Sequence, residues 1–443
     1  MRSTLERTPA LPSQGTVEPS AAASLVSADG IHVARSIFVD PAIYAAEKHL
    51  IFARSWLFLG HESQLPQPGD FLTTRLAETP VIVTRSRGGA IRAHVNSCSH
   101  RGLPVCRADL GNAHRFVCPY HGWTYDGDGA LVAVPQERKV GRIDRSSLGL
   151  PAVPRIESYR GFLFGSLDAQ IEPLADYLGD MRFYLDTYLD RFPGGIELVG
   201  PPQKWRLRAN WKLPYENQLG DLGHASYLHG ALFATNDAGR ETEAHGFAMV
   251  PRAGHSASLR LMPEESTAEE RAWGIEGVSA GMDPELLRYL LAVQAEAERR
   301  LGPLRARIKG LTLGIYPNLN FVWSNHALRV SHPCGPDETE IWTWLVLPKD
   351  APDSIRRALR GQYNYVLGPG GIVEQEDSEA WAQQWIGSRS DYPQDRPYHY
   401  GLGAGQERPH PELPGMASGL FNEYYARAFY QRWRADMLRD ERA

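Results

Sequence analysis

The pattern of apolar and polar residues changes near residue 168. Before that point the chain runs through short apolar segments separated by Gly and Pro: WLFLG, DFLTTRL, PVIVTRS, AHVNS, RFVCPY, GWTYD and GFLFGSLD. Short segments with turn residues between them at this spacing are typical of β-strands. We therefore expect a small all-β domain over residues 55–168.

Helical periodicity follows after residue 168. Apolar residues recur at helical spacing in three stretches, with strand-like runs between them: 171–192, 284–301 and 353–367 for the helices, 311–323 and 340–348 for the strands. Because helices and strands do not alternate strictly, this pattern favours an antiparallel sheet. The fold class we expect is α+β, with the larger domain over residues 169–443.

The two ends of the chain differ in character. The last apolar stripe predicts a helix that docks on the core and consists of Phe421, Tyr425, Ala428, Phe429, Trp433 and Met437. Residues 1–30 are rich in charge and Pro and lack the apolar core of a secretory signal, so we expect a mobile arm. Residues 31–54 should form a helical segment that packs on the larger domain.

Composition narrows the class of protein. The chain has 443 residues, of which 42% are hydrophobic and 22% charged, and this length predicts more than one domain. No apolar run approaches the roughly 20 residues that span a bilayer. The net charge is −5, and no basic stripe is interleaved with aromatic residues, which argues against a nucleic-acid partner. We expect a cytoplasmic protein without a membrane segment.

The four cysteines point to a metal rather than to disulfides. Cys98, Cys106 and Cys118 lie close together in the sequence beside histidines, whereas a disulfide scaffold of this length would contain more cysteines, spread more widely. A metal centre explains why the cysteines lie beside histidines, and a reducing compartment explains why the chain has so few cysteines.

The first candidate centre combines Cys98 and His100 with Cys118 and His121, and seventeen residues separate His100 from Cys118. Structural zinc sites usually pair Cys with Cys and His with His. Here each loop offers one thiolate and one imidazole, which is what a Rieske [2Fe-2S] cluster needs, since two His replace two Cys on one iron. The alternatives are a zinc site and ordinary packing residues; we interpret Cys106 as a packing residue.

A second candidate centre lies between residues 210 and 230, where Asp221, His224 and His229 come together. Two imidazoles and one carboxylate form the facial triad of non-heme Fe(II) oxygenases. Residues five apart are about 140° apart on an ideal helix, so we expect the helix to break between the histidines. A third ligand is expected from the acidic run 374–377. The alternatives are a buried helix with hydrogen-bonded histidines and a solvated acidic surface.

These motifs together resemble the large (α) subunits of Rieske non-heme iron aromatic-ring-hydroxylating oxygenases. The resemblance extends from about residue 55 to residue 437. It rests on the following residues: Asn96, Cys98, His100, Arg101, Gly102, the run CPYHGWTY from Cys118, Asn210-Trp211-Lys212, Glu216-Asn217, Asp221, His224 and His229.

The resemblance implies a catalytic domain of the helix-grip type. It also implies that His224, His229 and Asp377 hold the mononuclear Fe(II), and that Asp221 is a bridge rather than a ligand. In such enzymes this Asp links a cluster histidine, here His121, to an iron-ligating histidine of a neighbouring subunit, here His224. Function then requires an oligomer, either an α3 trimer or an α3β3 assembly with a small β subunit.

The activity implied is cis-dihydroxylation of an aromatic substrate with O2, as in aromatic hydrocarbon catabolism. The electrons would come from NAD(P)H through a ferredoxin, a flavin reductase or both. The chain itself is not expected to bind the dinucleotide, because GLGAGQ at residue 401 lacks the last Gly of a dinucleotide fingerprint and follows no strand. Two alternatives remain open: a Rieske monooxygenase or demethylase with the same metals, and an electron-transfer protein without oxygenase activity.

Candidates for substrate contact follow from their positions near the second centre. They are Asn217, Gln218, Leu222, Ala225 and Phe321, with Tyr316 and Asn318 on the same strand-like run as Phe321. Their mixture of apolar and amide groups suits an aromatic ring that carries a polar function. Most of these side chains could equally belong to the core.

Overall fold

The computed structural model describes residues 23–141, 143–230, 246–272, 283–391, 396–419 and 421–439. Most of the expected N-terminal arm lies outside these ranges. Its last residues do not form an arm: Val26 is fully buried, and its carbonyl accepts a hydrogen bond from Arg434 Nε at 3.0 Å. This stretch packs against the C-terminal helix α14 (Tyr424–Met437) because Val26 contributes to the core.

The N-terminal segment contains η1 (Arg35–Phe38), α2 (Pro41–Leu50) and η2 (Phe52–Arg54). Helix α2 contributes Glu47, which is fully buried and forms an ion pair with Lys212 Nζ at 2.5 Å. Two indole N–H groups, from Trp211 and Trp433, also donate to its carboxylate, at 2.8 and 2.7 Å. One carboxylate thus joins the N-terminal segment to two helices of the larger domain.

We expect Glu47→Gln to destabilise the protein by about 3–5 kcal/mol, because breaking a buried ion pair leaves the Lys212 ammonium uncompensated. Urea denaturation followed by tryptophan fluorescence measures this loss. The double variant Glu47→Gln with Lys212→Met is the control, since it removes both charges and should be the more stable of the two. A single variant as stable as the unsubstituted protein would refute this role of the pair.

The segment from residue 55 to 168 consists of short antiparallel strands, as expected. They form three small sheets in the orders β10-β11-β2, β5-β4-β3-β6 and β7-β8-β9. Their bounds are β2 Leu57–His61, β3 Asp70–Leu76, β4 Thr79–Arg85, β5 Ile91–Val95, β6 Leu110–Asn112, β7 Arg115–Val117, β8 Thr124–Asp126, β9 Leu131–Ala133, β10 Arg155–Tyr159 and β11 Phe162–Ser166. A four-residue helix, α3 (Glu137–Val140), follows β9.

The larger domain is built on a ten-stranded antiparallel sheet, so the α+β prediction is confirmed. Its order is β12-β19-β18-β17-β16-β15-β14-β22-β21, and β13 also pairs with β19. The strands are β12 Ile196–Leu198, β13 Gln203–Leu207, β14 Gly246–Arg252, β15 His255–Leu261, β16 Ile308–Ile315, β17 Leu319–Val322, β18 Ala327–Pro333, β19 Thr339–Pro348, β21 Arg408–Pro409 and β22 Met416–Gly419. The two-residue strand β20 (Tyr398–His399) pairs with β1 (His32–Val33) instead.

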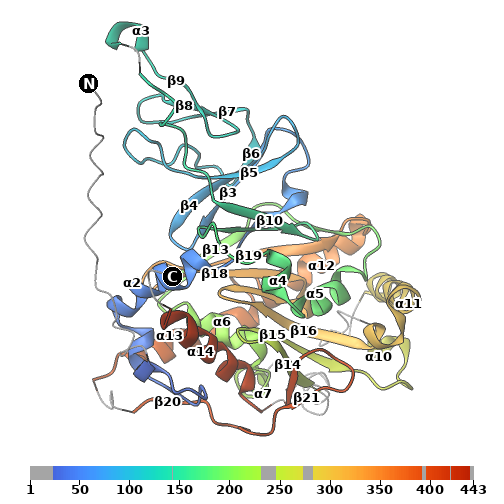
Figure 1. The fold of residues 1–443 in the computed structure, drawn as a ribbon. Helices are drawn as coiled ribbons and strands as arrows, with labels where there is room; N and C mark the ends of the chain where they lie inside the picture. The colour runs from blue at the N-terminus through green and yellow to red at the C-terminus, as the bar shows by residue number, and fades with distance from the viewer. Residues whose placement is uncertain are drawn as a thin grey trace.

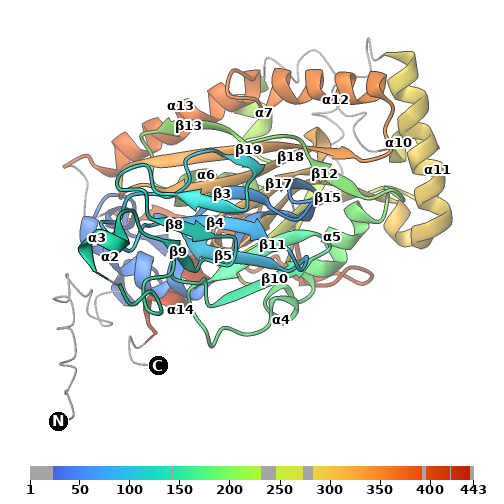
Figure 2. The ribbon, with the colours of Figure 1, turned by 90° about the horizontal axis from the view of Figure 1, so that it is seen from above.

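Two layers cover the faces of this sheet (Figures 1 and 2). On one face, α4 (Leu174–Leu178) and α5 (Met181–Leu189) share an apolar core with the sheet and with β2 and β11. The other face is covered by α6 (Lys212–Gly220), α12 (Asp353–Val366), α13 (Ile372–Ser388) and α14. Helix α11 (Pro284–Ala306) packs at the end of the domain against α5 and α12.

The structure departs from the expected elements in three places. The expected helix over 171–192 is divided into α4 and α5 at Gly179, which has a φ of +49°. The expected strand over 311–323 is a hairpin of β16 and β17 that turns at Tyr316-Pro317. The acidic run 374–377 lies inside α13, which the apolar pattern does not predict, because this helix buries charged side chains along with its tryptophans.

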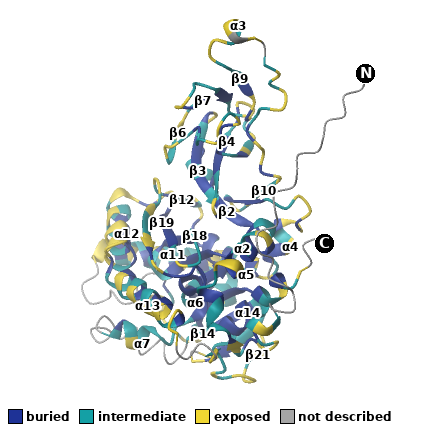
Figure 3. Ribbon diagram, turned by 90° about the vertical axis from the view of Figure 1, so that its left-hand side faces the viewer, coloured by how far each residue is buried: buried dark blue, intermediate teal, exposed yellow. Residues whose placement is uncertain are grey.

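The small β-rich domain projects from the larger one (Figures 1 and 3). Its strands β7 to β9 lie at the far tip, while α6 and α7 (Ala225–Leu228) lie on the opposite side of the molecule. Two ion pairs cross between the domains, Arg75 with Glu340 and Lys204 with Asp109, each at 2.5 Å. Within the described ranges, no helix is long and apolar enough to cross a membrane.

Candidate metal centres

Two loops at the tip of the small domain share one backbone pattern. The Cys98 N–H donates to the Leu103 carbonyl at 2.9 Å, and the Cys118 N–H donates to the Trp123 carbonyl at 2.8 Å. In each loop, the glycine four residues after the cysteine donates back to the cysteine carbonyl and has a positive φ, +79° and +71°. The two loops therefore present their side chains in equivalent ways.

The two cysteines lie in one buried cluster, and the two histidine rings lie side by side. Both cysteines are buried, and all four cysteines of the chain are free. The rings of His100 and His121 lie 4.6 Å apart between centroids. Their Nδ1 atoms are buried, and neither finds a hydrogen-bond partner in the part of the chain that the structure describes. Two thiols and two unpaired imidazole nitrogens from equivalent loops fit the donor set of a Rieske [2Fe-2S] cluster.

The surroundings of these loops add two groups to which the sequence pattern assigns no role. The Tyr125 hydroxyl lies 3.3 Å from Cys98 Sγ and accepts a hydrogen bond from the Ser99 N–H at 3.0 Å. The Trp123 ring stacks on His100 with the two planes only 6° apart. Cys106, by contrast, directs its Sγ to the Ala108 carbonyl at 3.8 Å, which agrees with a packing residue.

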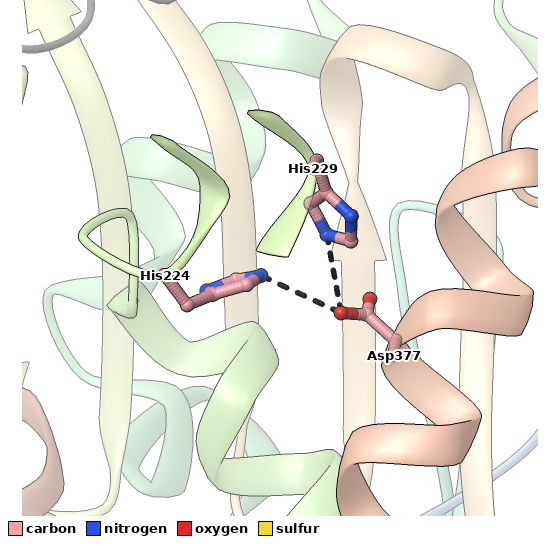
Figure 4. Close-up of side chains that lie close together, drawn as sticks. All are labelled: His224, His229 and Asp377. Atoms are coloured by element: carbon pink, nitrogen blue, oxygen red, sulfur yellow. Dashed lines mark ion pairs between the residues drawn. The ribbon is translucent and has the colours of Figure 1, made fainter. Parts of the chain in front are cut away.

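The second centre forms where a helix breaks. Helix α6 ends at Gly220, and the single turn α7 is flanked by His224 before it and His229 after it. Figure 4 shows both rings directed at Asp377 of α13. The distances from Asp377 Oδ1 are 3.5 Å to His224 Nε2 and 3.2 Å to His229 Nε2. Because the helix is interrupted, histidines five residues apart reach one point.

This group has the composition and spacing of a metal site. One potential ligand atom from each of the three residues lies within 4.8 Å of the other two. Asp377 and His229 are buried, and among the described residues neither Asp377 oxygen nor His229 Nε2 makes a hydrogen bond. Two imidazoles and a carboxylate, with His229 Nε2 and both Asp377 oxygens lacking hydrogen-bond partners among the described residues, fit a non-heme iron ion.

The charges of the site follow from these contacts. Burial alone would lower the pKa of His224, but the carboxylates of Asp221 and Asp377 outweigh it and raise that pKa to about 10. Burial would raise the pKa of Asp377, yet the two histidines hold it at about 2. Asp377 is thus a carboxylate at neutral pH, and a metal ion that binds here displaces the proton of His224.

Asp221 lies beside this group rather than in it. Its Oδ1 accepts a hydrogen bond from the His224 N–H at 3.2 Å, and its backbone carbonyl accepts one from His224 Nδ1. Its side chain is about one-third exposed (35%) and therefore remains open to a partner. His121, the other residue of the expected bridge, lies between β7 and β8, which belong to the projecting small domain and are far from α7 (Figure 1).

The expected substrate-contact residues divide into two groups. Asn217 and Gln218 lie on α6, and Asn217 Nδ2 is 3.4 Å from His224 Nδ1. Leu222 and Ala225 are partly exposed and lie on the segment that carries the histidines. Phe321 is not brought to the ligand group, because it packs in the core on the α5 side of the sheet, with its ring centroid 4.7 Å from that of Tyr188.

The two expected residues beside Phe321 also make structural contacts. Tyr316 packs under the Arg432 guanidinium, which lies 4.9 Å from the ring centroid. The Asn318 amide donates to the Ser331 carbonyl at 3.2 Å.

Comparison with known proteins agrees with this geometry. Residues 55–156 match the family model of the Rieske [2Fe-2S] domain, and residues 174–439 match that of the ring-hydroxylating alpha subunit, catalytic domain. The chain belongs to the ring-hydroxylating alpha-subunit family. It is a Rieske non-heme iron oxygenase, whose cofactors are a [2Fe-2S] cluster and a mononuclear iron.

Relatives of this oxygenase cover nearly the whole chain. The alpha subunit of biphenyl 2,3-dioxygenase from Rhodococcus jostii is 35% identical over 415 residues, which cover 90% of this chain and 87% of the relative. The large oxygenase component of a naphthalene 1,2-dioxygenase system from Ralstonia is 35% identical and covers 93% of both chains. The solved structure of naphthalene 1,2-dioxygenase with indole in its active site superimposes with a TM-score of 0.83 at 31% identity, covering 94% of each chain.

Two interactions of the oxygenase behind the ligand group are not evident from sequence. Glu376 Oε2 lies 2.7 Å from His229 Nδ1, which leaves His229 Nε2 free to face Asp377. Arg329 of β18 forms a fully buried ion pair with Glu374 and so attaches α13 to the sheet one turn before Asp377. The alternative of a solvated surface for the acidic run is wrong for Glu374 and Asp377, since both are buried.

We expect Glu376→Ala to weaken iron binding by about 10- to 100-fold, because a carboxylate on the outer nitrogen of a ligating histidine fixes its tautomer and raises its basicity. Competition with a chelator for the mononuclear iron measures the change. Glu379→Ala is the matched control, because it removes an exposed carboxylate of the same helix. Equal iron affinity in both variants would contradict the role given to Glu376.

Proposed function

We propose that Cys98, His100, Cys118 and His121 hold the Rieske cluster of this oxygenase. We further propose that His224, His229 and Asp377 hold the mononuclear iron at which an aromatic ring is dihydroxylated. The observation that carries the second assignment is the convergence of two imidazole Nε2 atoms on one buried carboxylate oxygen. When bound, the cluster transfers single electrons and the mononuclear iron activates O2.

The chain itself orients the ligands and balances their charge. The Asp221 carbonyl holds Nδ1 of His224, and Glu376 holds Nδ1 of His229, so both histidines present Nε2 inward. Asp377 supplies negative charge in a buried setting, where it compensates a cation more strongly than it would in water. Asn217 extends from α6 toward the His224 ring and borders the space next to the site.

We propose that electrons cross between neighbouring chains. Within one chain, the tip that carries the Cys-His loops and the segment that carries Asp221 lie on opposite sides of the molecule (Figures 1 and 3). Asp221 would connect His121 of one chain with His224 of the next. A head-to-tail contact of this kind forms a ring when the rotation between copies closes, and we propose that it closes as a trimer of α chains.

Exposed apolar side chains support such a contact. Val117 and Tyr120 flank Cys118 and are 55% and 58% exposed, while Tyr227, three residues after His224, is 83% exposed. Phe421 and Leu402 are also about half exposed and lie near Glu423, which accepts a hydrogen bond from the Leu402 N–H at 2.9 Å. Gly220, the neighbour of Asp221, lies against the Tyr425 side chain two residues after Glu423, which supports a position of this patch close to the bridge residue.

The chain is the large component of a multicomponent system that takes electrons from partner proteins. We propose a ferredoxin, a flavin reductase or both as donors, and a cytoplasmic location that keeps the cluster thiols reduced. Since relatives are named for biphenyl and naphthalene, we propose an aromatic substrate that leaves as a cis-dihydrodiol. Native mass spectrometry of the complex purified with the products of neighbouring genes distinguishes α3 from α3β3.

Incubation with a panel of aromatic compounds, a reductase system, NADH and ¹⁸O₂ tests this function. The proposal predicts a cis-dihydrodiol that carries two labelled oxygen atoms from one O2 molecule. A product with one labelled atom would identify a monooxygenase or demethylase instead. Reduction of the cluster without any labelled product across the panel would favour an electron-transfer protein.

A further inference from the structure

Gln218 lies one side chain away from the mononuclear iron ligands. Its Nε2 donates to Asn217 Oδ1 at 3.1 Å, and Asn217 Nδ2 is 3.4 Å from His224 Nδ1. Only 6% of the surface of Gln218 is exposed. His224 thus contacts Asn217, and Asn217 contacts Gln218, so a buried amide lies close to an iron-ligating histidine.

Among the described residues, the acceptor half of this amide has no donor. Gln218 Oε1 is buried and makes no hydrogen bond among the described residues. Exchanging the oxygen and nitrogen of Gln218 alone would place Oε1 against Asn217 Oδ1, and two acceptors repel. A buried acceptor without a donor is uncommon in folded proteins and destabilises the free enzyme.

A second buried amide on the same side of the sheet also has an oxygen without a hydrogen-bond donor among the described residues. Asn320 of β17 is fully buried under α6, where its Nδ2 lies 3.5 Å from the Tyr215 carbonyl, and its Oδ1 has no donor among the described residues. Gln218 and Asn320 thus use their N–H groups within the protein, and the oxygen of each lacks a donor among the described residues. An N–H or O–H group of a bound molecule would supply that donor.

We propose that Gln218 determines specificity by accepting a hydrogen bond, through Oε1, from an N–H or O–H group on the ring of the aromatic substrate. This inference rests on the proposed function, since it assumes that the ring binds beside His224. It narrows the substrate class from aromatic hydrocarbons in general to aromatic rings that carry an N–H or O–H group. Because a site with a buried unpaired acceptor rejects analogues that lack the donor, the preference comes from both attraction and exclusion.

Three planar bicyclic compounds of nearly equal shape test the proposal. Indole carries an N–H donor, benzofuran carries only an acceptor, and indene carries neither. Isothermal titration of each into the metal-loaded oxygenase measures binding without turnover, and kcat/KM under ¹⁸O₂ is measured in parallel. We expect indole to bind about tenfold more tightly than benzofuran or indene. In Gln218→Met, which keeps the length of the side chain, this ratio should fall to about one.

The controls separate a substrate contact from a structural role. Gln383→Met makes the same change on the exposed face of α13 and should keep the tenfold ratio. If Gln218 only supports Asn217, Gln218→Met will weaken all three compounds equally, and this outcome overturns the proposal. Equal binding of the three compounds by the unsubstituted enzyme also overturns it, since water then satisfies Oε1. Failure of the proposed function would appear differently, as binding without any oxygenated product.

Discussion

Replacing His224 with alanine is expected to remove the mononuclear iron and abolish product formation while the cluster remains. Among the described residues, His224 supplies one of the two imidazoles that face Asp377, and a site reduced to one histidine and one carboxylate does not retain iron at a working concentration. The Cys-His loops are on the other side of the molecule and should not respond (Figure 1). Iron analysis measures the mononuclear iron, the visible spectrum measures the cluster, and ¹⁸O incorporation measures product formation.

An exposed histidine of the same domain provides the control. His399→Ala should keep both metals and full activity, because His399 is exposed and does not contact the ligand group. If oxygen incorporation persisted in His224→Ala after the mononuclear iron had gone, the oxygenase site would have to be elsewhere. The same experiment separates an oxygenase from an electron carrier, since a carrier would lose no function.

Replacing Asp221 with asparagine is expected to lower turnover by about 100-fold or more while both metals stay bound. Asparagine can still accept the hydrogen bond from the His224 N–H, so the fold of the segment between α6 and α7 should survive. What is lost is the negative charge that connects two imidazoles across the proposed interface. Stopped-flow reoxidation of the reduced cluster by O2 and substrate should slow in parallel with turnover.

Asp337→Asn is the matched control, because it neutralises an exposed carboxylate in the β18–β19 turn. It should leave the reoxidation rate unchanged. Reoxidation of the cluster in Asp221→Asn at the rate of the unsubstituted enzyme would exclude Asp221 from the electron path, even if turnover fell for another reason.

Much of the architecture could be predicted because the patterns involved are local. Short apolar runs divided by Gly and Pro indicate the small β-rich domain, and apolar residues at helical spacing indicate α12 and α14. Helix α13 could not be found in this way, since it buries Glu374 and Asp377 together with Trp381 and so has no clear apolar stripe. The hairpin at Tyr316-Pro317 was also missed, because an apolar run does not reveal where it turns back.

The residues of the candidate sites also divide into those that could be predicted from the sequence and those that could not. The Cys-His loops and the pair His224 and His229 could be recognised because each set lies within a short stretch of sequence. Glu376 and Arg329 could not be assigned, because each contacts a residue far away in the chain and acidic or basic residues are usually on the surface. Phe321 was misplaced, because a strand near the site has two faces and its sequence does not identify the one that faces the metal.

The central claim is that the cluster of one chain serves the mononuclear iron of its neighbour, and subunit complementation tests it most directly. Differently tagged His121→Ala and Asp377→Ala chains are expressed together, and oligomers that contain both are isolated by tandem purification. Each variant alone should be inactive. In a cyclic trimer with both kinds of chain, one junction joins an intact cluster to an intact iron site, so we predict about one third of the unsubstituted activity. Mixed oligomers with no activity would contradict the account.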